Sequence, residues 1–220
     1  FYQFFFSRVK FKKYFETNHS FKNIYFSWGF HKNFDKNGNF KDRYTNKNVS
    51  KFKDTLIFLI YLDAQLPKKV KSNTVLVYKK HFYKNFNFLF FIKYIFKNLH
   101  SNFFKKMSSF SSLSDQILDF IKKDISIRNL KKVFIIYEGQ PYQKNIILYL
   151  KKSLRSINVI GYDHSAPPAL PLNLFYDGCS PDKLLITGKE QSQFYKRYLN
   201  WPKSKLKIIP SFRFKNEKKS

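Results

Sequence analysis

The stretch that decides the fold is Lys132-Val-Phe-Ile-Ile-Tyr-Glu-Gly-Gln-Pro141. Its first six residues place large apolar side chains on both faces, which is typical of a strand inside a parallel sheet. Glu138 to Gln140 end this strand, and Pro141 is a residue preferred at the first position of a helix. Residues 142–154 continue with apolar side chains at helical spacing. The sequence therefore predicts a strand followed directly by a helix.

The same alternation continues toward the C-terminus. Apolar runs at 158–162, 183–187 and 206–209 predict further strands, and 190–199 predicts a helix that Pro202 ends. Strands that alternate with helices of about ten residues are typical of βαβ crossovers and a parallel sheet. We therefore predict an α/β domain with a Rossmann-like parallel sheet and flanking helices.

The N-terminal part gives fewer signals. Residues 55–62 and 74–78 are short apolar runs that predict strands, whereas residues 1–50 show no clear period. Ser114 is a candidate N-cap for a helix over 115–123, after a Ser-rich connector.

These signals suggest how the chain is divided. We expect residues 1–129 to belong to the same α/β domain as the βαβ portion at 130–220. The chain opens at Phe1 without a Met, and its last strand-like segment has no closing helix. We therefore expect a fragment of a longer protein, truncated before a second domain.

Residues 81–106 predict a basic, aromatic-rich amphipathic helix, with Phe86, Leu89 and Phe96 on one stripe. Such a helix either packs into the core with a solvated Lys face or lies on an anionic membrane surface. No apolar run reaches the roughly 20 residues that a membrane span needs. We therefore expect a cytoplasmic protein. If the helix at 81–106 lies on a membrane surface, the protein would be peripheral at the inner face of the cell membrane.

The formal net charge of +28 favours a nucleic-acid or membrane partner. However, 36 of the 42 basic residues are Lys, and Lys, Phe, Asn and Ile all use AT-rich codons. The charge is also spread evenly, with +17 in residues 1–129 and +11 in residues 130–220. Genome bias therefore accounts for most of the basicity, and a nucleic-acid-binding module is the alternative function rather than the first.

Nothing in the sequence indicates a metal or a cofactor. Cys179 is the only cysteine, and the five His residues lack metal-ligand spacing. Asp35, Asn37 and Asn39 are spaced as in a calcium loop, but Phe40 stands where that loop requires Gly. Walker, GxGxxG, GxSxG and HExxH motifs are absent from the sequence.

Polar residues and glycines follow each predicted strand of the C-terminal part. Because ligands bind beyond the carboxyl ends of the strands in open parallel sheets, these residues are the candidate site. Glu138 is a candidate acid or base or, alternatively, a helix-capping charge. Asp163 and His164 could form a base with its orienting neighbour, but adjacent residues on an extended chain point to opposite sides. His164 is therefore the better candidate for a hydrogen-bond donor to a sugar or phosphate. Gly188 either admits a phosphate or only permits a turn.

Three segments in succession carry a resemblance: Tyr137-Glu-Gly-Gln-Pro-Tyr-Gln143, Ile160-Gly-Tyr-Asp-His-Ser165 and Pro181-Asp-Lys-Leu-Leu-Ile-Thr-Gly188. In this order they resemble bacterial surface-carbohydrate (capsule and lipopolysaccharide) biosynthesis proteins with a glycosyltransferase-B-like fold. Residues 208–214 are similar to the next strand of that family, which carries an Arg near its end. Asp163 departs from the family pattern, in which Gln is commoner.

This resemblance implies a two-domain glycosyltransferase that moves a sugar from a nucleotide-sugar donor to a growing glycan or lipid-linked acceptor. The C-terminal domain of such enzymes binds most of the donor, so this chain would hold the N-terminal, acceptor-side domain and be inactive alone. The implied catalytic residues are Glu138 and His164. The implied substrate-binding residues are Gly139, Gln140, Asp163, Gly188 and Arg213.

Overall fold

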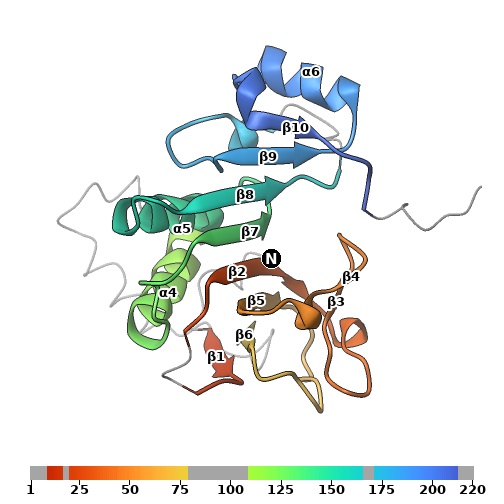
Figure 1. Ribbon diagram of the computed structural model, residues 1–220, viewed down its shortest axis with the longest axis vertical. Helices are drawn as coiled ribbons and strands as arrows, with labels where there is room; N and C mark the ends of the chain where they lie inside the picture. The colour runs from red at the N-terminus through yellow and green to blue at the C-terminus, as the bar shows by residue number, and fades with distance from the viewer. Residues whose placement is uncertain (1–8, 17–19, 79–108, 166–170, 213–220) are drawn as a thin grey trace, which may run out of the picture.

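The computed structural model describes residues 9–16, 20–78, 109–165 and 171–212. Its centre is an eight-stranded sheet with the order β1-β6-β5-β2-β7-β8-β9-β10 (Figure 1). The strands are β1 (Lys10–Lys13), β2 (Asn23–Gly29), β5 (Thr55–Tyr61), β6 (Thr74–Tyr78), β7 (Lys132–Ile136), β8 (Asn158–Tyr162), β9 (Lys183–Ile186) and β10 (Leu206–Ile208).

The remaining described elements are short except for three helices. The helices are α4 (Ser109–Asp124), α5 (Pro141–Ser153) and α6 (Lys189–Tyr198). A two-stranded ribbon pairs β3 (Lys41–Asp42) with β4 (Lys47–Asn48). Four 3-10 turns complete the described part: η1 (His31–Asn33), η2 (Val49–Lys51), η3 (Leu172–Leu174) and η4 (Lys203–Lys205).

All neighbours in the large sheet are parallel except β1, which pairs antiparallel with β6. The chain moves outward from β2 through β5 to β6, then returns to β7 on the other side of β2 and continues to β10. The strand order therefore reverses between β2 and β7, and ligands bind at such a reversal in doubly wound sheets. The predicted α/β class with a mostly parallel sheet is confirmed, and the topology is compatible with a Rossmann-like fold.

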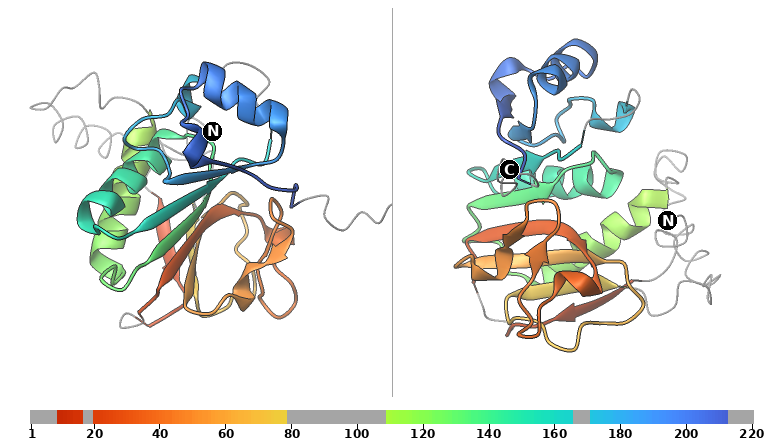
Figure 2. Two further views of the ribbon diagram at one scale, coloured as in Figure 1. Left: turned by 45° about the horizontal axis from the view of Figure 1, so that its top comes forward. Right: turned by 90° about the vertical axis from the view of Figure 1, so that its right-hand side faces the viewer.

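The two faces of the sheet are covered differently. Helices α4 and α5 pack on one face, where Ile117, Ile121, Ile146 and Leu150 join alternate residues of the strands in one core cluster. The opposite face of β2, β5 and β6 is covered by the segment that holds β3, β4 and η2 (Figure 2). No helix among the described residues covers that second face over β7 to β10, where Phe134, Ile160 and Leu185 are half-buried.

The sequence-predicted strands and helices of the C-terminal part are confirmed to within one or two residues, as are the strands at 55–62 and 74–78. The central strand β2 was missed. Its residues Ile24 to Gly29 are all buried because parallel neighbours and both covered faces surround it. A strand buried on both faces has no apolar-polar alternation, so periodicity does not distinguish it from the aromatic-rich residues around it.

The prediction that Ser114 caps a helix is wrong, since α4 begins at Ser109 and Ser114 is buried in its interior. Leu113 lies one turn before Ile117 and is also fully buried. Burial of this extended apolar stripe outweighs the weak preference of Ser for a helix terminus.

Two predictions fall outside the described residues: the amphipathic helix at 81–106 and the site residue Arg213. Among the helices that the structure describes, none combines the length and apolar character required to cross a membrane. Strands from both halves of the chain, 1–129 and 130–220, belong to the same sheet.

We expect Gly161→Ala to destabilise the protein, because an added Cβ in β8 would lie 2.8 Å from Pro181 Cγ and 3.0 Å from Leu184 Cδ1. Overpacking of this kind typically costs about 1–3 kcal/mol. Gly178→Ala is the matched control, since a Cβ there meets nothing within 4 Å. Urea unfolding of both variants measures the difference, and equal stabilities would contradict the packing of β8 described above.

Candidate functional site

The loop after β7 is held in place by Gln143 from the first turn of α5. Its side-chain oxygen accepts hydrogen bonds from the backbone N–H groups of Glu138 (2.9 Å) and Gln140 (3.2 Å). Its side-chain nitrogen donates to the Ile136 carbonyl oxygen at 2.8 Å. Gly139 has φ +65°, a conformation that favours glycine, and an added Cβ would lie 2.2 Å from the Asn173 carbonyl oxygen. The hydrogen bonds of Gln143 and the backbone conformation of Gly139 therefore hold the loop that presents Glu138 in place.

Glu138 is half-buried at the point where the strand order reverses. Burial is the main cause that raises the pKa of its carboxyl group, and the nearby Asp163 charge raises this pKa further. Hydrogen bonds with the side chains of Trp28 and Gln140, and the positive charge of Arg43, act in the opposite direction. The net effect is a carboxyl group with a raised pKa beside a cation, which makes Glu138 a candidate acid or base.

Arg43 reaches this edge because the β3–β4 ribbon is anchored by the fully buried Asp42. The Asp42 carboxylate accepts hydrogen bonds from the Tyr44 and Thr45 N–H groups, both at 2.8 Å, and from the Ser27 hydroxyl. Burial raises the pKa of Asp42, and these hydrogen bonds lower it. A buried carboxylate with several donors fixes the ribbon against β2, and so fixes the positions of Arg43 and Tyr44.

The ribbon meets the end of β8 through a ring contact. Tyr44 packs edge-on against His164, with ring centroids 4.4 Å apart. The guanidinium of Arg43 stacks over the rings of Tyr44 and Phe30, 5.0 and 5.1 Å from their centroids. Residues from the loops after β2 and β8 therefore form one continuous surface, and His164 belongs to it.

Asp163 turns away from His164 and toward α6, as the alternation along an extended chain predicts. Its Oδ2 accepts hydrogen bonds from Gln191 Nε2 (2.7 Å) and from the Tyr195 hydroxyl, and its Oδ1 accepts one from the Ser165 N–H (3.2 Å). Burial raises the pKa of Asp163 to about 6, although these three hydrogen bonds lower it. In this geometry Asp163 connects the end of β8 to α6 through its hydrogen bonds. Its charge raises the pKa of Glu138.

Gly188 lies farther along the edge, as the residue before the first turn of α6. Its φ of −149° is extended backbone that any residue adopts, so the turn itself does not require glycine. An added Cβ would meet only Glu190 Oε2, at 3.6 Å. The sequence prediction that Gly188 contacts substrate stays a prediction.

The structure thus brings together Glu138, Gly139, Gln140, Asp163 and His164 at neighbouring strand ends, with Gly188 one strand farther out. Sequence reasoning missed the residues that β2 and its loop supply. They are Trp28, Arg43 and Tyr44. One signal for Arg43 was present, since it is one of only six Arg in a chain whose other basic residues are Lys.

No group of three or more His, Cys, Asp or Glu side chains suited to a metal occurs within residues 9–16, 20–78, 109–165 and 171–212. Comparison with models of known protein families, and with curated proteins, gave no match. The geometry of this edge and the sequence resemblance are therefore the two observations that bear on function.

Replacement of Asp163 by Asn should change how stability depends on pH. The pKa of Asp163 is raised from 3.8 to about 6, so its contribution to folding is complete below pH 3.8 and is lost as pH rises through 6. The difference in unfolding free energy between wild type and Asp163→Asn should therefore shrink by up to about 3 kcal/mol over this interval.

Urea unfolding at a series of pH values between about 3.5 and 7 measures this change. Asp54→Asn is the control, since Asp54 is exposed and pairs with Lys22 on the surface. A difference between wild type and Asp163→Asn that stays constant with pH would show that the Asp163 carboxyl titrates normally.

Proposed function

We propose that this chain is the acceptor-side domain of a two-domain, glycosyltransferase-B-like enzyme of bacterial surface-polysaccharide biosynthesis. The observation that carries the proposal is the half-buried Glu138 carboxyl, which has a raised pKa and lies at the reversal of strand order beside Arg43. The resemblance of the segments around Glu138, His164 and Gly188 to that family supports the same assignment.

The proposed chemistry uses Glu138 as a general base. An acceptor hydroxyl gives its proton to the Glu138 carboxylate while its oxygen forms a bond to the anomeric carbon of the donor sugar. The bond from that carbon to the phosphate oxygen of the donor breaks, and the electron pair leaves with the nucleoside phosphate. A carboxylate of raised pKa is a stronger base than an exposed Glu and is suited to this proton transfer.

Arg43 and His164 have complementary parts in this proposal. Arg43 lies close enough to Glu138 to lower its pKa and stacks on two rings, so its guanidinium is held in a defined orientation. It would favour the negative charge that develops on the leaving phosphate. His164, packed against Tyr44, would donate a hydrogen bond to a sugar hydroxyl or phosphate. The second domain would supply most contacts to the nucleotide-sugar donor.

We expect Glu138→Gln to reduce sugar transfer about 100-fold or more, because Gln keeps the size and hydrogen bonding of Glu but cannot take a proton. The measurement is transfer of radiolabelled sugar from a panel of nucleotide sugars to bacterial surface glycans, by the complete reading frame that contains this chain. Acceptor binding, measured by calorimetry, should change little. Wild-type activity should fall on acidification at a pH above that at which an exposed Glu titrates.

Glu16→Gln is the control for Glu138→Gln, because Glu16 is an exposed carboxylate that follows β1, the edge strand beyond β6. Transfer by this variant should match the wild type. The proposal would be overturned by wild-type transfer in Glu138→Gln, or by absence of transfer from every nucleotide sugar tested.

A further inference from the structure

A second candidate site lies at the amino ends of β2, β5 and β7, which begin with Asn23, Thr55 and Lys132. It is a pocket of about 530 Å³, formed between β2, β7 and the segment that holds β4 and η2. Its lining residues are Asn23, Ile24, Tyr25, Thr45, Lys47, Lys51, Phe52, Lys53, Thr55, Lys132, Phe134 and Phe212.

The charged side chains described around this pocket are all positive. Lys47, Lys51, Lys53 and Lys132 line it, and its lining within the described part of the chain includes no Asp or Glu. None of the four lysines forms an ion pair with a carboxylate of the described residues. Asp54 is next to Lys53 in sequence, but its carboxylate pairs with Lys22 at 3.1 Å. Four lysines around one pocket, none of them ion-paired with a described carboxylate, favour a ligand with several negative charges.

The walls of the pocket are aromatic. Tyr25 and Phe134 are cross-strand neighbours on β2 and β7, and their rings stack with centroids 5.1 Å apart. The ring of Phe52 lies edge-on to Tyr25 and is 39% exposed. Phe212 closes one end, where Lys47 Nζ lies 4.8 Å above its ring. Flat, rigid side chains of this kind favour a planar ring in the ligand, which packs on them with little loss of entropy.

We propose that this pocket binds a nucleoside phosphate, with the base against Phe52 and Phe212 and the phosphates at the lysines. The volume is in the range of small-molecule sites, roughly 300–1,000 Å³, and suits one nucleotide better than a length of polymer. Lys binds phosphate as a point charge and imposes no fixed geometry, so the four lysines can bind a ligand with one, two or three phosphates.

This site is separate from the carboxyl edge, and the inference does not depend on the proposed glycosyl transfer. Lys132 begins β7 and Glu138 follows its end, so the two residues are about 20 Å apart along the strand. Segment 42–47 contributes residues to both sites. Tyr44 packs on His164, whereas Thr45 and Lys47 line the pocket.

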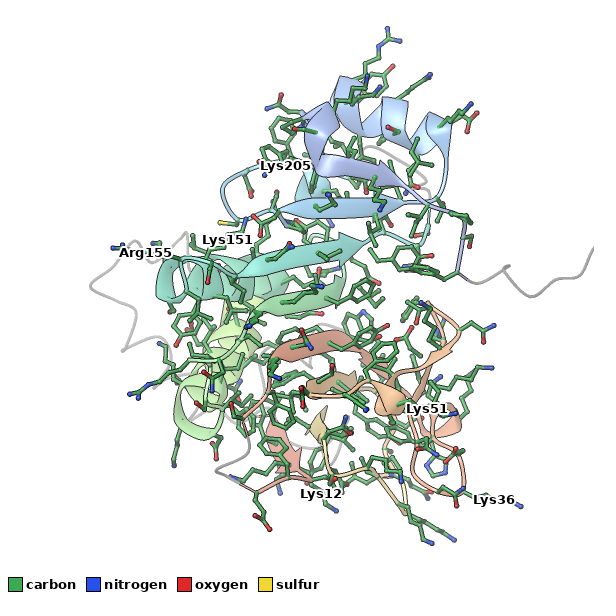
Figure 3. All side chains as sticks on the ribbon, in the orientation of Figure 1. Lys12, Lys36, Lys51, Lys151, Arg155 and Lys205 are labelled. Atoms are coloured by element: carbon green, nitrogen blue, oxygen red, sulfur yellow. The ribbon has the colours of Figure 1, made fainter. Side chains whose placement is uncertain are left out.

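The test is the binding of a fluorescent, N-methylanthraniloyl-labelled ADP to the full chain, followed by anisotropy. Binding should be saturable, displaced by unlabelled ADP, and weakened about tenfold by the double substitution Lys51→Gln and Lys132→Gln. Both lysines are exposed, so the variant should fold normally. The matched control is Lys36→Gln with Lys68→Gln, which removes the same charge from exposed residues that do not line the pocket. Figure 3 shows Lys36 on a separate turn from Lys51.

Four competing ligands, namely ADP, pyrophosphate, adenosine and a long oligothymidylate, separate the alternatives. Displacement by ADP at lower concentration than by pyrophosphate or adenosine supports the proposal, because base and phosphate then both contribute. Equal displacement by pyrophosphate would overturn the proposed role of the aromatic walls. If the chain binds only a long oligothymidylate, the proposed nucleotide site is wrong and a diffuse nucleic-acid surface is favoured. The same conclusion follows if the control variant loses as much affinity for labelled ADP as the pocket variant.

The failure of this test is distinguishable from failure of the proposed transferase activity. Glu138→Gln does not alter a residue of the pocket, so it should leave the affinity for labelled ADP unchanged within about twofold. Loss of nucleotide binding in the lysine variant together with normal binding in Glu138→Gln supports a separate site. Equal loss in both variants would place the nucleotide at the carboxyl edge and overturn this inference.

Discussion

The parallel pairing of β2 with both β5 and β7 is the constraint on which the rest of the structure depends. A parallel pair cannot be joined by a tight hairpin, so the chain must leave the sheet after each strand and return at its amino end. Crossovers in the two directions from β2 lie on opposite faces. The reversal at β2 leaves the loops after β2 and β7 adjacent at the carboxyl edge, where ligands bind in doubly wound sheets.

Three buried polar side chains hold the loops at the carboxyl edge in defined positions. Gln143 holds the loop that presents Glu138, and Asp42 holds the ribbon that presents Arg43 and Tyr44. Asp163 holds the end of β8 to α6. Each anchor is buried and well supplied with hydrogen-bond partners, so the cost of its desolvation is offset. The more exposed groups at the edge, Glu138 and Arg43 among them, are positioned by these anchors.

The same arrangement gives a strongly basic chain two regions of different chemical character, which are the two proposed sites. At the carboxyl edge, a carboxyl of raised pKa lies with an Arg and a His, an arrangement suited to proton transfer and polar recognition. At the pocket beside η2, the described lining combines lysines with aromatic rings and includes no carboxylate. The evenly spread charge of the sequence conceals this contrast, because folding separates the lysines that flank the pocket from those on solvated helix faces.

Much of the C-terminal half was determined by local sequence. Apolar runs ended by Gly, Pro or acidic residues placed β7 to β10, α5 and α6, and the order of strands and helices implied that Glu138 and His164 share an edge. The start of α4 was decided by packing of Leu113 rather than by Ser114. The central strand β2, the position of Arg43 and the lysine pocket were decided only by the tertiary structure. They depend on pairings between residues about 100 positions apart, such as Tyr25 with Phe134, and periodicity within a short window contains no information about such partners.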